Sequence, residues 1–293
     1  WAITDDFDLG LIAWYSEDED NCCSLTHREL DPNARFFGVI PVTETNPLTL
    51  PRISDTLVDP EIDQEPEADT EDTGVSLKAN WALGDFNITS ITSYNEWDYE
   101  DLGDVDWSAY DIAGAFTGGA LHGGITSASD TSTDFFSQEL RLASSLGDNM
   151  EYLVGLYYAD ADTDRSFSRT MPLTADWKAS ASTESIAAFG QLTWMLSEQT
   201  HLTVGGRYND EEITVDFDDL TAGDNFSESD SEDEWLGKIS IQHFMAENTM
   251  LFASFSTGYK GQAYDISTGF NQDKADNPVG SESSDSYEVG VKT

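Results

Sequence analysis

The chain has 293 residues, and its 57 acidic and 13 basic residues give a formal net charge of −44 at pH 7. This excess of carboxylates argues against a nucleic-acid partner, because phosphates are bound through basic patches. Hydrophobic residues make up 39% of the chain, and no run approaches the roughly 20 apolar residues of a membrane-spanning helix, which excludes a helical membrane protein.

In chain order, the sequence predicts about ten antiparallel strands after a stub at residues 1–4. Each strand alternates apolar with polar side chains and is near the length that a tilted membrane strand needs. The clearest pair is 183–196 with 201–208, where Leu192 and Trp194 share one face against Gln191 and Thr193. The predicted strands are 7–16, 75–83, 86–97, 135–146, 152–158, 183–196, 201–208, 235–242, 251–260 and 284–293.

The connections between these strands alternate in length. Short turns are predicted at 84–85, 147–150, 197–200 and 245–248, and long loops at 17–73, 98–130, 163–182, 218–232 and 261–283. This asymmetry is typical of a transmembrane β-barrel with short periplasmic turns and long extracellular loops. In lipid every backbone amide needs an internal partner, which a closed barrel provides. The predicted fold class is therefore all-β, an antiparallel transmembrane β-barrel.

A soluble antiparallel β protein with one wet face is the alternative fold. Two features argue against it. The apolar faces carry aromatic residues near strand ends, as membrane-interface girdles do, at Trp81, Trp194, Tyr208, Trp235, Tyr259 and Tyr287. The opposite faces carry charges in mid-strand, where a polar lumen tolerates them, at Glu139, Arg141, Arg207, Lys238 and Glu288.

Acidic residues concentrate in Glu17–Asp20, Asp59–Asp72, Asp98–Asp106 and Asp218–Glu234. We interpret these segments as solvated loops, and the alternative is divalent-cation binding among loops or to lipopolysaccharide. Cys22 and Cys23 are adjacent, so they bridge each other only in a strained ring or pair with another segment. With His27 nearby a metal site is conceivable, but the spacing matches no standard zinc pattern.

The sequence contains no catalytic motif. A phosphate-binding loop, a dinucleotide fingerprint, a Gly-x-Ser-x-Gly elbow and a paired-histidine metal motif are all missing, so no enzyme activity, cofactor or metal site is predicted. His122 lies in the glycine-rich segment 118–124. It could be presented to haem iron, although a surface histidine in a mobile loop is the favoured interpretation.

Six segments, in order, resemble the β-barrel of TonB-dependent outer-membrane receptors, in particular the siderophore-receptor-like group. They are Phe136–Leu142 (FSQELRL), Tyr152–Tyr158 (YLVGLYY), Ala187–Gln191 (AAFGQ), Leu202–Glu211 (LTVGGRYNDE), Phe252–Gly261 (FASFSTGYKG) and Ser286–Thr293 (SYEVGVKT). The family's usual Gly-Gly-Phe-Asn is replaced by Gly261-Gln262-Ala263-Tyr264-Asp265, and residues 1–73 resemble the family only in strand pattern.

The resemblance implies a 22-stranded barrel with an N-terminal plug and a TonB box, in the outer membrane of a Gram-negative bacterium. Residues 1–293 correspond to the middle of that barrel, without the plug or the C-terminal strands. The chain begins at Trp1 without a signal peptide, so we expect it to be a piece of a longer polypeptide. Alone, with open strand edges, it is not expected to transport anything.

The implied function is uptake of a ferric siderophore or a similarly bulky scarce nutrient. The implied partners are the plug, TonB–ExbB–ExbD acting through it, and outer-membrane lipid and lipopolysaccharide. The alternatives are a passive porin-type channel and a soluble acidic β adhesion protein. Candidate ligand contacts, for which loop packing is the alternative role, are Trp107, Tyr110, Phe116, His122, Trp177 and Tyr264. Candidate lumen residues, which contact the plug or pair with each other across strands, are Glu139, Arg141, Arg207 and Lys238.

Overall fold

The structure is a computed structural model, and it describes residues 1–21, 31, 33, 35–36, 40–41, 62–170 and 174–293. Cys22, Cys23 and His27 lie outside the described residues. One antiparallel sheet of eleven strands dominates the molecule. In sheet order its strands are β1 (Ala2–Thr4), β2 (Phe7–Asp20), β5 (Glu67–Leu83), β6 (Phe86–Asp104), β7 (Thr126–Ser145), β8 (Met150–Arg169), β9 (Ala175–Ser197), β10 (Thr200–Asp219), β11 (Asp224–Ala246), β12 (Thr249–Lys260) and β13 (Glu282–Lys292).

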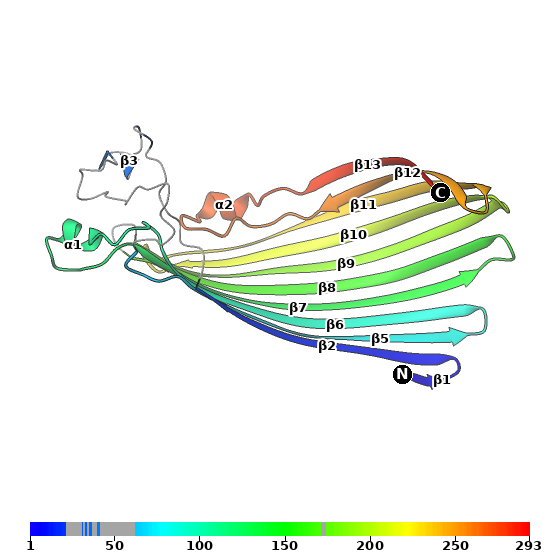
Figure 1. The fold of residues 1–293 in the computed structure, drawn as a ribbon, viewed down its shortest axis with the longest axis horizontal. Helices are drawn as coiled ribbons and strands as arrows, with labels where there is room; N and C mark the ends of the chain where they lie inside the picture. Colours follow the sequence, from blue (N-terminus) through cyan, green and yellow to red (C-terminus); the bar gives the residue numbers. More distant parts are fainter. Residues whose placement is uncertain (22–30, 32, 34, 37–39, 42–61, 171–173) are drawn as a thin grey trace.

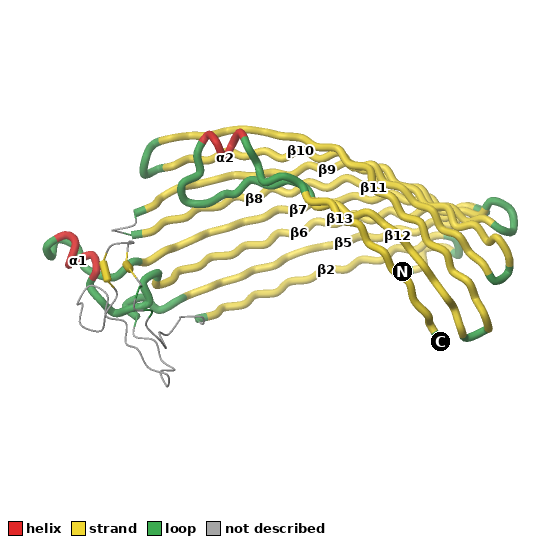
Figure 2. The backbone as a smooth tube through the Cα atoms, turned by 90° about the horizontal axis from the view of Figure 1, so that it is seen from above, coloured by secondary structure: helices red, strands yellow, loops and turns green. Residues whose placement is uncertain are grey.

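Each strand of this sheet pairs with its neighbour along the chain, and the sheet curves as a whole (Figures 1 and 2). The prediction of ten strands plus an N-terminal stub is confirmed, and β1 is the stub. The remaining described elements are small. They are β3 (Arg35–Phe36) paired with β4 (Ile40–Pro41), and the helices α1 (Ile112–Thr117) and α2 (Gln272–Asp276).

Two kinds of connection lie at opposite ends of the sheet. Both termini and the tight turns that join β5 to β6, β7 to β8, β9 to β10 and β11 to β12 lie at one end, which we call the turn end (Figure 1). The long segments 105–125 and 261–281 lie at the other end, which we call the loop end. At this end, however, β8 ends at Arg169 and β9 begins at Ala175, and residues 220–223 join β10 to β11, so the predicted long loops 163–182 and 218–232 are wrong.

The strands are longer than predicted because they continue into the acid-rich segments. Residues 67–72, 98–104, and 218–219 with 224–234 are paired strand rather than solvated loop. Acidic residues in these segments alternate with other side chains, and a strand whose outer side faces water accommodates carboxylates on that side. Acid density is therefore a poor marker of a loop in this chain.

The polarity of the two sheet faces inverts along the strands. In β9 the outer, convex face is apolar toward the turn end, with Ile186, Leu192 and Trp194 exposed. Toward the loop end the same face carries Asp176, Lys178 and Glu184, while the inner face carries Trp177 and small apolar residues. The apolar outer band marks the lipid-facing part, and the strands extend beyond it as a wall with a polar outside.

Cross-strand register extends the assignment of faces across the sheet. Leu192, Val204, Ile239, Phe255 and Tyr287 occupy one continuous row of paired residues on the outer face. Phe255 packs on Tyr287, with ring centroids 4.8 Å apart. The predicted lipid-facing positions thus share a face with the exposed apolar residues of the neighbouring strands.

Three inner-face glycines lie under aromatic rings from the adjacent strand. A Cβ built on Gly74, Gly155 or Gly290 would lie 2.0, 2.4 and 2.5 Å from the nearest ring atom of Trp14, Phe189 and Phe252, respectively. The ring occupies the space that a side chain at the glycine would need, so a large aromatic residue lies against the wall.

The largest described apolar core lies at the loop end, on the inner face. Segment 261–281, which includes α2, packs there through Phe270 and Ala275 onto Trp177 and Phe217. Ring centroids are 5.3 Å apart for Trp177 and Phe217, and 4.8 Å apart for Phe217 and Phe270. The segment therefore covers part of the concave face above the apolar band. None of the helices among the described residues has the length and apolar character needed to cross a membrane.

Candidate functional site

The inner wall has a cationic hollow of about 410 Å³ at the level of the outer apolar band. Arg141, Arg207 and Lys238 line it, so the structure brings together three of the four predicted lumen residues. Gly205, which pairs with Lys238 on the same face, provides part of the space because it adds no side chain to the inner wall. In a chain of net charge −44, this hollow offers three cations to an anionic group on the inner side.

Aromatic contacts fix the guanidinium of Arg207. Its carbon lies 5.2 Å from the ring centroid of Tyr157 and 5.9 Å from that of Phe189, within the range of cation–π attraction. Its Nη2 also donates to Asn209 Oδ1 over 3.1 Å. Arg207 is consequently held against the wall, with the ring of Phe189 lying over Gly155.

Glu139 and Arg141 form an ion pair, with Arg141 Nε facing Glu139 Oε1. Both residues lie on β7, two positions apart and on the same face. The alternative interpretation of pairing across strands is therefore wrong for these two. The pair neutralises one of the three cations of the hollow, and Glu139 itself is not part of the lining.

The loop-end segment 105–125 carries four of the predicted ligand-contact residues. Trp107 and Phe116 are 38% and 46% exposed, while Tyr110 is intermediate in exposure. Trp107 has a φ of 50°, and its backbone N–H donates to Asp104 Oδ1 over 2.5 Å. That bond holds Trp107 in the left-handed region, which is unfavourable for a large side chain.

His122 is a surface residue, with 75% of its side chain exposed, and it contacts a carboxylate. Its Nδ1 lies 2.7 Å from Asp111 Oδ2. Asp111 Oδ1 accepts the N–H groups of Gly114 and Gly123, each over 2.8 Å, and the first of these bonds caps α1. The bond from His122, followed by these two amides, holds the pKa of Asp111 below its ordinary value.

Trp177 lies differently from the sequence-based expectation, whereas Tyr264 lies in the loop segment where it was expected. Trp177 is in strand β9, not in a loop, and only 3% of it is exposed. Its Nε1 donates to Thr268 Oγ1 over 3.2 Å, and its ring stacks on Phe167 and Phe217. Tyr264 packs against the same apolar core. Both residues anchor segment 261–281, which is the packing role considered as their alternative.

Sequence reasoning missed a carboxylate cluster at the base of segment 105–125. Asp104 accepts from Trp107 N, Asp106 accepts from Ile125 N over 2.5 Å, and Asp63 accepts from Gly124 N. Burial, and then the charge of Asp106, raise the pKa of Asp104 to about 6. Asp106 and Ile125 lie 19 residues apart and Asp63 and Gly124 lie 61 apart, so no local pattern signals the cluster.

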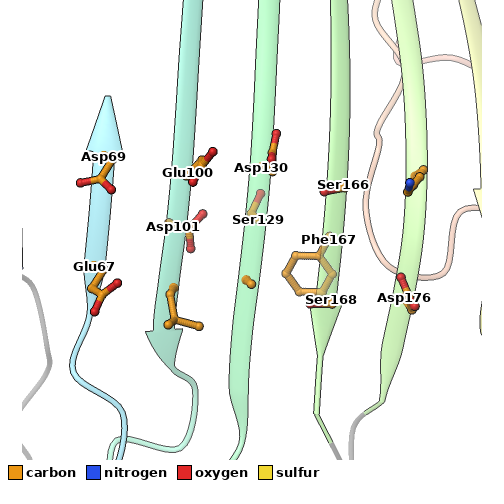
Figure 3. A pocket seen from close by; sticks show the side chains of 13 residues that line it. Glu67, Asp69, Glu100, Asp101, Ser129, Asp130, Ser166, Phe167, Ser168 and Asp176 are labelled. Carbon is orange, nitrogen blue, oxygen red and sulfur yellow. The ribbon is translucent and has the colours of Figure 1, made fainter. Parts of the chain in front are cut away.

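A second hollow, of about 520 Å³, lies across β5 to β9 near the loop end (Figure 3). Acidic residues are the largest group in its lining, among them Asp69, Glu100 and Asp130 from three neighbouring strands, and Lys178 is the one cation that lines it. Among the described residues, no group of three or more His, Cys, Asp or Glu side chains is arranged to hold a metal ion.

Comparison with known proteins places this wall in a family. The family model described as "TonB dependent receptor-like, beta-barrel" matches residues 26–293. The pesticin receptor of Yersinia enterocolitica is 26% identical over 161 residues, which cover 53% of this chain and 24% of that protein. The chain thus spans about a quarter of the length of the curated relatives that it matches.

Two solved structures share the fold. The ferric yersiniabactin uptake receptor FyuA from Yersinia pestis matches with a TM-score of 0.63 and 19% identity, over 78% of this chain and 34% of that one. The siderophore receptor PiuA from Acinetobacter baumannii matches with a TM-score of 0.67 and 12% identity, over 98% of this chain and 45% of that one.

The chain belongs to the TonB-dependent receptor β-barrel family. It is a stretch of outer-membrane barrel wall, and its apolar convex face is the side that meets lipid.

Proposed function

We propose that this wall serves a TonB-dependent receptor that takes up a ferric siderophore or a similarly bulky, scarce nutrient across the outer membrane. The observation that carries the proposal is the contrast between the two faces of the strands. An apolar outer band lies opposite a polar inner wall with the hollow of Arg141, Arg207 and Lys238. The titles of the ferric yersiniabactin uptake receptor and of the siderophore receptor support iron-chelate uptake.

The cationic hollow is proposed as a plug contact. A plug that fills the lumen needs polar partners on the wall, and acidic or carbonyl groups of the plug match two arginines and a lysine. Glu139 sets the position of Arg141 through their ion pair. The plug then connects the wall to TonB–ExbB–ExbD, and the loop-end residues Trp107, Tyr110 and Phe116 contact the ligand from outside.

Iron uptake tests the proposed function. The receptor that carries this chain is expressed in a Gram-negative strain that lacks its own siderophore receptors, and uptake of radiolabelled ferric chelates is measured with and without TonB. We expect saturable uptake that disappears without TonB. Uptake that is linear in concentration and indifferent to TonB would instead establish the passive porin.

The plug contact has its own test. In the same receptor, Arg207→Ala with Lys238→Ala should loosen the plug and admit a large antibiotic that the intact outer membrane excludes. Lys78→Ala is the matched control, because Lys78 also lies on the inner face but does not line the hollow. If the control leaks as much as the double variant, the hollow is not the plug contact.

A further inference from the structure

The part of β11 nearest the loop end forms an edge of the sheet. Residues 224–237 pair with β10 on one side. On the other side, β12 pairs with β11 only as far as Lys238, opposite Ser256, and beyond that point the described pairing of β12 is with β13. Every side chain from 227 to 231 is exposed, and Trp235 is 71% exposed, so this edge lies in water. Figure 1 shows β11 continuing past the end of β12.

A hydrogen bond shows which backbone groups of β11 point away from β10. Gly237 N donates to Thr257 Oγ1 of β12 over 2.9 Å, so the amide of Gly237 faces the edge. Successive residues of a strand direct their N–H and C=O groups to opposite sides. The odd-numbered residues from 225 to 235 therefore present their backbone groups along the edge. In the described part of the chain, one amide of this row has a partner, since Ser231 N donates to Asp230 Oδ1 over 2.9 Å.

The two faces beside this edge differ in charge. The inner face, where Phe226 packs against the loop-end core, carries a carboxylate at each even-numbered position that follows, at Glu228, Asp230, Glu232 and Glu234. These carboxylates are about 7 Å apart along the strand. The outer face carries small polar side chains at Ser227, Ser229 and Ser231. A strand added at this edge would therefore meet a row of negative charges on its inner side only.

Neutral groups satisfy two of these carboxylates without cancelling their charge. Ser281 Oγ donates to Glu232 Oε1 over 2.7 Å, and Gln272 Nε2 donates to Glu228 Oε1 over 3.1 Å. Lys274, the cation of α2, lies 2.7 Å from Asp265 and is paired with it instead. The inner side of the edge consequently remains strongly negative.

This charge determines which strand can pair with the edge. A second copy of β11 would place carboxylates opposite carboxylates, and like charges directly opposite each other destabilise a strand pair. Charged side chains on an edge also discourage pairing with neutral strands. A strand with lysine or arginine at every second position is complementary, because opposite charges across a strand pair stabilise it.

We propose that the edge at residues 225–235 binds an extended basic segment of another polypeptide, which adds to the sheet as a strand beside β11. The odd-numbered residues of the edge supply backbone hydrogen bonds, and the four inner carboxylates meet the cations of the added strand. A shift by one residue would turn those cations to the outer face, so the charges specify the register. The edge is at the loop end, beyond the apolar band, so the partner arrives from outside the cell. This interaction goes beyond nutrient uptake and does not depend on which nutrient is taken up.

The probe is a synthetic peptide of about twelve residues that alternates lysine with threonine, a length that covers the edge. It is added to the receptor that carries this chain, in uncharged detergent, and hydrogen exchange is followed at single residues. The amides of Ser227, Ser229 and Asp233 should exchange more slowly when the peptide binds. Those of Glu228 and Glu234 point toward β10 and should not change.

Two variants separate strand addition from simple attraction of charges. Ser229→Pro keeps every charge but removes an N–H from the open edge, and it should abolish the peptide-induced protection while the pairing with β10 remains. Asp230→Asn with Glu234→Gln should weaken peptide binding about tenfold. The matched control is Asp210→Asn with Glu212→Gln, because these exposed carboxylates of β10 lie on the outer face and should leave binding unchanged.

Three results would overturn the inference. They are peptide binding that protects none of the odd-numbered amides, equal weakening in the outer-face control, and unchanged protection in Ser229→Pro. Protection of the same amides in concentrated receptor without any peptide would assign the edge to a second copy of this chain, which also contradicts the inference.

Discussion

Gly155 offers a sharp test of the inner-wall packing. In Gly155→Ala the new Cβ would lie 2.4 Å from Phe189 Cζ and 2.9 Å from Leu140 O. The ring can move, but the carbonyl is part of the β7–β8 ladder and cannot move without disturbing the pairing. Overpacking of this kind typically costs about 1–3 kcal/mol.

Gly237→Ala is the matched control, since nothing lies within 4 Å of its built Cβ. Removing a glycine from a strand interior there should stabilise by about 0.5–1 kcal/mol. Because the same gain offsets part of the clash at Gly155, we expect Gly155→Ala to destabilise by about 1–2 kcal/mol in net terms.

Equilibrium urea unfolding in detergent micelles, with tryptophan fluorescence as the signal, measures both variants. A Phe189→Leu background should recover part of the loss in Gly155→Ala, because it removes the ring but leaves the contact with the Leu140 carbonyl. Equal stability of the Gly155→Ala and Gly237→Ala variants would refute the packing argument.

Three further predictions follow from the faces, the ends and the carboxylate cluster. Ile241→Arg should lower folding stability in lipid vesicles by about 2–4 kcal/mol if the site is near the midplane of the bilayer, while Lys238→Gln should change it little. A larger loss of stability in Lys238→Gln than in Ile241→Arg would contradict the register. Protease added to intact cells should cut within 105–125 and spare the turn 147–149; cleavage only at the turn would invert the topology. Asp104, whose pKa is raised to about 6 from an ordinary 3.8, binds its proton more tightly in the folded state. Lowering the pH from 7 to 5 should therefore strengthen the protection of segment 105–125 against hydrogen exchange. Asp104→Asn should abolish most of this pH dependence, and an unchanged dependence would exclude Asp104 as its source.

The sign of that pH effect follows from linkage. A carboxyl group whose pKa is raised by folding stabilises the folded state while it is protonated, below about 4, and this stabilisation is lost as the pH rises through about 6. The charges that face Asp104 are those of Asp106 and Asp63, which add to the effect of burial, and the N–H of Trp107 opposes it. The window of pH 5 to 7 therefore spans the steep part of the titration.

Local patterns were sufficient to predict the strands but not where they end. Alternation predicted all ten strands and the stub, because side-chain period is a local property of a strand. The strand ends at the loop end of the sheet were missed because their acidic residues suggested loops. Residues 224–234 instead pair with 209–219 over their full length. There the outer face is wet, so charge and strand pairing are compatible.

The candidate site was predicted in part. Arg141, Arg207 and Lys238 were predicted as lumen residues from the face they share, and the register brings them to one hollow. Trp177 was expected in a loop, but its burial depends on Phe270, far along the chain, and no nearby residue signals that contact. The Asp111–His122 bond was missed for a similar reason, since it depends on how segment 111–123 closes.

A spin-label scan along β9 tests the central assignment of the two faces most directly. Nitroxides are placed one at a time at positions 176–196 of the receptor in lipid vesicles, and their collisions with oxygen and with a water-soluble nickel complex are compared. From Ile186 to Leu196, even-numbered positions should be accessible to oxygen and shielded from nickel, with the opposite at odd-numbered positions. From Asp176 to Glu184, even-numbered positions should become accessible to nickel. Even-numbered positions that meet nickel throughout 186–196 would contradict the assignment of this face to lipid.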